Sequence, residues 1–175
     1  LPKFMFEALY LAIGGIDKAR LVSDANIKNL LTNDYVAHGD RYLSADLAFE
    51  GADLFVIFIW SGLRVIGFKV IEKNDGKDIE DTIKAMAHEW QVPRSNIVYD
   101  ADGVGIFLKG YLANAVNFKN GAPPVPVEGQ KVDYKNLKSQ CEFKLAEIIT
   151  ACLMYFDCGK DIEEHWLAIM EELET

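Results

Sequence analysis

Three apolar segments joined by very short connections constrain the fold of this chain most strongly. Residues 41–48, 53–61 and 64–73 show the alternation or the apolar runs that are typical of strands. The segment 49–52 separates the first two, and the dipeptide Gly62-Leu63 separates the second and third. Connections this short join antiparallel neighbours. The sequence therefore predicts an antiparallel three-stranded sheet.

Helices and further strands alternate in the rest of the chain. A fourth strand is predicted at 96–100, and a fifth is expected in the Pro-rich segment at 124–127. Ser23 is expected to cap one of the helices. The segments predicted to be helical are 3–20, 24–31, 78–90, 103–116, 135–156 and a last one from about residue 161.

This order of elements predicts an α/β fold with a mixed sheet flanked by helices, three antiparallel strands coming first and parallel strands after them. A right-handed crossover places the fourth strand beside the first and parallel to it. The pattern resembles the ribonuclease H-like fold. We expect the domain to span residues 41–175, with residues 1–40 as a helical lead-in.

Two of the predicted strands carry an aspartate at or near their carboxyl end. Because side chains alternate along a strand, Asp46 shares a face with Ser44, and Asp100 shares one with Val98. If the two strands are parallel neighbours, about 4.8 Å apart, the two carboxylates meet at one rim of the sheet. Carboxylates this close repel each other unless a cation lies between them.

A divalent cation is the expected partner of this acid pair. Mg²⁺ and Mn²⁺ prefer oxygen ligands, and two ions about 4 Å apart activate water and stabilise the leaving oxygen in phosphodiester hydrolysis. Asp53 and Asp102 are further candidate ligands, although each has another interpretation. Asp53 is also typical of a turn, and Asp102 is also typical of a helix cap.

The formal charge of −9 argues against a protein that coats nucleic acid, because phosphate binding rests on Lys and Arg. Local lysines that flank the Pro-rich segment are nevertheless candidates for contacts with a DNA backbone, the alternative being a solvated helix face. They are Lys119, Lys131, Lys135, Lys138 and Lys144. No apolar run is long enough to cross a bilayer, so no membrane partner is predicted.

Three segments together resemble the C-terminal nuclease domain of tailed-phage terminase large subunits. They are 41–53 (RYLSADLAFEGAD), 96–105 (NIVYDADGVG) and 134–140 (YKNLKSQ). In that family Asp46 and Asp100 would be the first and second metal-binding catalytic acids, and Asp53 would match an auxiliary acid. The family's third acid lies late in the domain, and we expect it beyond Thr175.

The resemblance implies an endonuclease that cuts concatemeric viral DNA during packaging in the host cytoplasm, with Mg²⁺ or Mn²⁺ as cofactor. It implies double-stranded DNA, the terminase ATPase domain, the small terminase subunit and the portal protein as partners. Residues 1–40 would then lead in from the ATPase domain, and ATPase activity is not expected here because no P-loop motif is present.

Two alternatives remain open from the sequence. A Holliday-junction resolvase-type nuclease would share the fold and the acids. A non-catalytic ribonuclease H-like module would instead use the Pro-rich loop at 121–127 to dock a partner.

Overall fold

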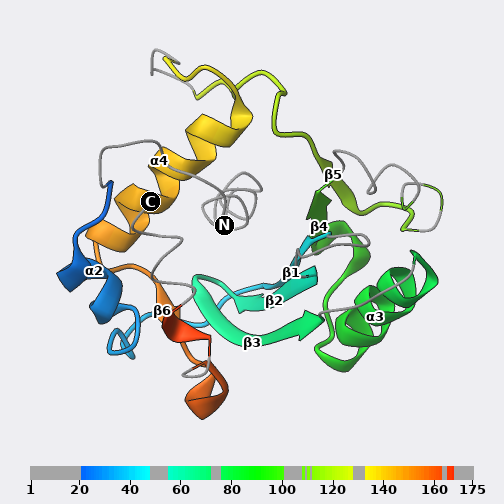
Figure 1. Cartoon of the computed structure of the whole chain (residues 1–175), viewed down its shortest axis with the longest axis horizontal. Coiled ribbons are helices and arrows are strands. Elements are labelled where there is room, and N and C mark those ends of the chain that lie inside the picture. The colour runs from blue at the N-terminus through cyan, green and yellow to red at the C-terminus, as the bar shows by residue number, and fades with distance from the viewer. Residues whose placement is uncertain are drawn as a thin grey trace.

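The structure of the chain is a computed structural model, and its elements are labelled in Figure 1. The structure describes residues 21–47, 55–71, 76–100, 108, 110, 112–127, 133–162 and 165–167. Its strands are β1 (Arg41–Asp46), β2 (Phe55–Ser61), β3 (Arg64–Ile71), β4 (Ile97–Asp100), β5 (Val116–Phe118) and β6 (Tyr155–Phe156). Its helices are α2 (Asp24–Asn29), α3 (Gly76–Glu89), α4 (Leu137–Thr150) and the 3-10 turns Arg94–Asn96 and Gly159–Ile162.

The described strands form one mixed sheet in the order β5-β4-β1-β2-β3-β6. The strand pairs β1–β2 and β2–β3 are antiparallel, and β4 lies beside β1 and parallel to it. The pairs β4–β5 and β3–β6 are also parallel. The predicted fold class and the predicted neighbourhood of the first and fourth strands are therefore confirmed.

Each face of the sheet is covered by helix, because alternate side chains of the strands are apolar on both sides. The α3 helix and α4 lie on opposite sides of the strands (Figure 1). The core on the α3 side contains Leu43, Ala45, Ile57, Ile59, Ile79, Ile83, Ile97 and Tyr99. The core on the α4 side contains Val22, Ile27, Leu30, Phe58, Trp60, Val98, Phe118, Leu137, Cys141, Leu145 and Ile149.

The short α2 helix belongs to the α4 side of this core. Ser23 caps it as predicted, because the Ser23 hydroxyl accepts a hydrogen bond from the backbone N–H of Asn26 at 3.3 Å. Val22, Ile27 and Leu30 are buried in the same cluster as α4. The predicted helix at 3–20 lies outside the described residues. Among the described helices, none is both long and apolar enough to cross a membrane.

Two predicted elements in the second half of the chain are wrong. The fifth strand is Val116–Phe118 rather than 124–127. In 124–127 the backbone N–H of Val125 donates to the side-chain oxygen of Gln140 (2.7 Å), and the Val125 carbonyl accepts from the Gln140 amide (2.9 Å). The long helix ends at Thr150 rather than at 156, and the chain then forms β6.

The other predicted helices agree with the structure only in part. Half of the predicted helix at 103–116 lies outside the described residues. Its described end is wrong, because residues 112–115 form a bend and a turn and Val116 belongs to β5. The last predicted helix, from about 161, overlaps the end of the 3-10 turn Gly159–Ile162.

Candidate active site

The register between β1 and β4 brings the two predicted acids to the same place. Ser44 lies opposite Val98, and Ala45 lies opposite Tyr99. The next step of this register sets Asp46 beside Asp100, at the carboxyl end of both strands. Adjacent strands lie about 4.8 Å apart, so the backbones of the two aspartates are close neighbours.

Both aspartates point to the α4 side of the sheet. Leu43, Ala45 and Tyr99 pack in the core on the α3 side, so the alternate residues Asp46 and Asp100 face the other way. Both are half-buried. Ser44, one step earlier on the same face as Asp46, is buried and accepts a hydrogen bond from the indole N–H of Trp60 at 2.9 Å. The acid pair thus lies at the edge of the buried core on the α4 side of the sheet.

The loop after β5 reaches the same rim. Phe118 pairs with Asp100 across the parallel strands, and Asn120 follows two residues later. The Asn120 side-chain amide donates a hydrogen bond to Oδ2 of Asp100 at 3.4 Å. The backbone carbonyl of Asn120 accepts a hydrogen bond from the N–H of Lys138, in the first turn of α4, at 3.2 Å. The N-terminus of α4 is therefore fastened beside the acid pair.

A third acid, Glu142, lies one turn further along α4. Its side chain is only 13 % exposed, and its Oε1 is buried with no hydrogen-bond partner among the described residues. Lys138 Nζ lies 3.9 Å from this oxygen, which is an ion-pair distance but too long for a hydrogen bond. Burial raises the pKa of Glu142 above its ordinary value, and the nearby Lys138 ammonium lowers it in part.

The donor set of the acid pair fits a hard divalent cation. Mg²⁺ and Mn²⁺ are commonly held by one or two carboxylates, with water and substrate phosphate completing the coordination. Asp46 and Asp100 supply two carboxylates from rigid strands at one register position. No group of three or more His, Cys, Asp or Glu side chains suited to a metal occurs among the described residues.

The other residues predicted for the site are placed less fully. Asp53, Asp102 and Lys131 lie outside the described residues. Lys135 is exposed, two residues before α4, and Lys138 is half-exposed beside Asn120. These two lysines therefore lie at the end of α4 that adjoins the acid pair.

Sequence reasoning missed two polar residues of this region, Asn120 and Glu142. Asn120 lies in a loop that carries no motif, and its contact with Asp100 spans a long-range strand pairing. Glu142 could have been found from its spacing, because it lies four residues after Lys138 on one helix face.

Searches with this sequence found no matching family model and no matching curated protein. Solved structures do match the fold. A point mutant of the large terminase subunit gp2c from bacteriophage Sf6 with calcium has a TM-score of 0.77 at 17% identity, over 89% of this chain and 82% of that chain. A mutant nuclease domain of the same subunit with manganese gives a TM-score of 0.74 at 15% identity, over 89% and 81% of the two chains.

The large terminase nuclease from the thermophilic phage G20c also matches. Its TM-score is 0.54 at 16% identity, over 85% of this chain and 80% of that chain. The chain therefore has the ribonuclease H-like fold seen in the nuclease domains of phage large terminase subunits, and the resemblance predicted from the sequence is confirmed at the level of the fold.

Proposed function

We propose that this chain is the nuclease domain of a phage DNA-packaging terminase and that it cuts concatemeric viral DNA by metal-dependent hydrolysis. The observation that carries the proposal is the pairing of Asp46 and Asp100 at the ends of adjacent parallel strands, on one face. The shared fold supports it, because the similar solved structures are terminase nuclease domains.

Asp46 and Asp100 are the proposed ligands of Mg²⁺ or Mn²⁺, with Asp53 and Asp102 as further candidates. Bound divalent ions supply an activated water and stabilise the leaving oxygen of the phosphodiester. The two strands hold the carboxylates in fixed positions, because β1 and β4 are paired on both sides within the sheet. One of the similar Sf6 structures contains manganese and another contains calcium, which supports a divalent cation here.

A third carboxylate would complete the proposed site, and we place it outside the described residues. Asp157 is a poor candidate because it pairs with Arg64 near the start of β3, whereas Asp46 lies at the other end of the neighbouring strands.

Lysines beside the acid pair are the proposed contacts for the DNA backbone. Lys119 and Lys135 are exposed, and the backbone N–H of Lys138 donates a hydrogen bond to the carbonyl of Asn120, the residue after Lys119. With Lys131 they would place positive charge at the N-terminal end of α4, although the whole chain carries −9. Phosphate contacts need charge but read no sequence, so cleavage should depend weakly on sequence.

The remaining parts of the proposal follow from the family. Residues 1–40 would connect this domain to the terminase ATPase domain, and the small terminase subunit and the portal protein would be partners. The site of action would be the host cytoplasm.

Nicking of supercoiled plasmid with Mn²⁺ or Mg²⁺ tests the proposal. We expect Asp46→Asn and Asp100→Asn each to reduce the rate more than about 100-fold, because even outer residues of a metal site commonly cost 10- to 100-fold. Asp81→Asn is the matched control, since Asp81 is exposed on α3, on the other face of the sheet. It should nick at the wild-type rate.

Equal nicking by all four proteins would contradict the nuclease proposal. A strong preference for cruciform over linear duplex DNA would instead favour a resolvase-type nuclease.

A further inference from the structure

Asn120 is held in place from two directions. On one side it follows β5, whose Phe118 is paired with Asp100. On the other side, the first turn of α4 bonds the loop, because Lys138 N–H donates to the Asn120 carbonyl (3.2 Å) and Leu137 N–H donates to the Ala122 carbonyl (2.7 Å). The loop is also closed internally by a hydrogen bond from Ala122 N–H to the Lys119 carbonyl (3.1 Å).

These contacts serve the helix as well as the loop. The first backbone N–H groups of any α-helix lack partners within the helix. In α4, Asn136 caps the end by accepting from the N–H of Ser139 at 2.9 Å, and the loop carbonyls accept from Leu137 and Lys138. The backbone of Asn120 is therefore held by hydrogen bonds from α4 that do not depend on the side chain at this position.

The Asn120 side chain uses this fixed position to reach Asp100. Its amide donates to Oδ2 of Asp100 at 3.4 Å, at the long end of hydrogen-bond distances. An amide donor on one oxygen favours one rotation of the carboxylate. Hydrogen bonds of this kind orient metal-binding side chains in many proteins.

We propose that Asn120 is a positioning residue for Asp100, which it holds in the orientation that binds the divalent cation. The inference rests on the proposed nuclease function. It adds that a loop residue outside the predicted acids sets the orientation of Asp100 through its side-chain amide.

The test compares Asn120→Leu, which keeps the bulk but removes the donor, with Asn120→Gln, which keeps the amide. Affinity for Mn²⁺ alone is measured by calorimetry on the whole chain, and the Mn²⁺ concentration for half-maximal nicking is measured on supercoiled plasmid. We expect Asn120→Leu to weaken Mn²⁺ binding about 10- to 100-fold, to raise the half-maximal Mn²⁺ concentration in parallel, and to leave KM for DNA at saturating Mn²⁺ within twofold. Asn120→Gln should recover part of the loss.

Asn136→Ala is the matched control, because it weakens the cap of the same helix without removing a contact to Asp100. It should lower the urea unfolding midpoint but leave Mn²⁺ affinity within twofold, measured where every variant is folded. If Asn120→Leu and Asn136→Ala lose Mn²⁺ affinity equally, the loss reflects only the stability of the helix. That result would overturn the positioning role of Asn120.

Unchanged Mn²⁺ affinity in Asn120→Leu, with wild type binding Mn²⁺ through Asp46 and Asp100, overturns the inference alone. Absence of carboxylate-dependent Mn²⁺ binding in the wild type would instead overturn the proposed function, and the inference with it.

Discussion

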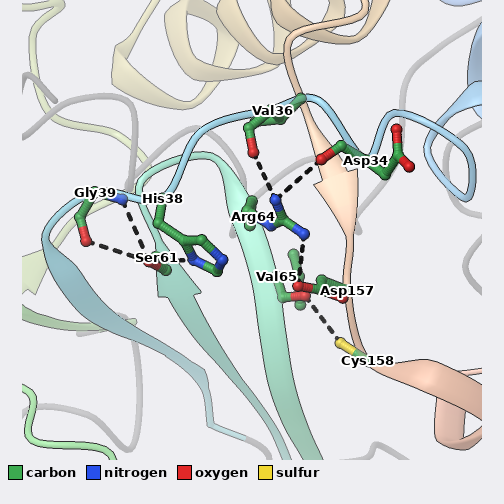
Figure 2. A network of polar contacts seen from close by, with 9 residues as sticks. All are labelled: Asp34, Val36, His38, Gly39, Ser61, Arg64, Val65, Asp157 and Cys158. Carbon is green, nitrogen blue, oxygen red and sulfur yellow. Dashed lines mark hydrogen bonds and ion pairs between the residues drawn. The ribbon is translucent and has the colours of Figure 1, made fainter.

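Replacing Arg64 by Ala should destabilise the fold strongly, because this side chain joins three separate segments. Its Nη1 donates to the carbonyls of Asp34 (3.1 Å) and Val36 (2.8 Å), and its Nη2 donates to Oδ2 of Asp157 at 2.8 Å (Figure 2). The guanidinium also lies over the ring of Tyr155, 4.8 Å from its centroid. The loop before β1, the start of β3 and the end of β6 are thus tied together.

The expected loss of unfolding free energy follows from the polar groups that lose their partner when Arg64 is truncated. A hydrogen bond from a charged group is worth about 1.5–3 kcal/mol, and breaking a buried ion pair costs about 3–5 kcal/mol. The Arg64 side chain is 13 % exposed, but the Asp157 side chain is 36 % exposed and can regain water. We therefore expect Arg64→Ala to lower the free energy of unfolding by about 3 kcal/mol, at the low end of the buried range. For a chain of this size that corresponds to a decrease in Tm of about 6–12 °C.

Two further variants separate the backbone contacts from the ion pair. Asp157→Asn removes only the charge and should cost about 1 kcal/mol, the usual worth of one hydrogen bond. Arg64→Lys keeps the charge but lacks the planar fork that spans three acceptors, so it should recover less than half of the loss. Urea unfolding followed by circular dichroism measures all three.

The reasoning would be refuted by an Arg64→Ala variant within about 1 kcal/mol of wild type, or by Asp157→Asn being equally destabilising. Because Arg64 lies at the opposite end of the strands from Asp46, Mn²⁺ affinity of the folded Arg64→Ala protein should equal that of wild type.

Two other predictions concern charge near the acid pair. Lys135→Ala should weaken binding of duplex DNA without divalent metal and reduce the slope of log K against log salt by about 0.9, measured by fluorescence anisotropy; an unchanged slope would remove Lys135 from the DNA contacts. Glu142→Gln should unfold at higher urea than wild type at pH 7, with the difference closing as the pH falls to 4. The reason is that burial raises the pKa of Glu142 above 4.5, so the wild type loses stability as this carboxyl ionises with rising pH. A difference that stays constant with pH would contradict this explanation.

The sheet could be predicted from the sequence because its signals are local. Alternation in 41–46 and 97–100 fixes which side chains share a face, and short connections fix the antiparallel pairs. The crossover rule then places β4 beside β1, which is enough to bring Asp46 and Asp100 together.

The errors arose where local signals conflict with long-range contacts. The segment Pro124-Val125-Pro126 is apolar and extended, but proline has no N–H for a ladder and Gln140 occupies the backbone of Val125. At the end of α4, Cys152 adopts the left-handed conformation (φ 55°) that a glycine usually adopts after a helix. No glycine or proline in the sequence predicted the end of α4 at Thr150.

The contacts of Asn120 and Arg64 could not be predicted for a different reason. Asn120 meets an acid 20 residues away, and Arg64 meets one 93 residues away, through pairings that exist only in the folded sheet.

A crystal soaked in Mn²⁺ tests the central claim most directly. We predict an anomalous peak between the two carboxylates, about 2.0–2.2 Å from an oxygen of Asp46 and from an oxygen of Asp100, on the face covered by α4. The peak should vanish in Asp100→Asn crystals soaked in the same way. Mn²⁺ bound only elsewhere, or the two carboxylates on opposite faces of the sheet, would contradict the account.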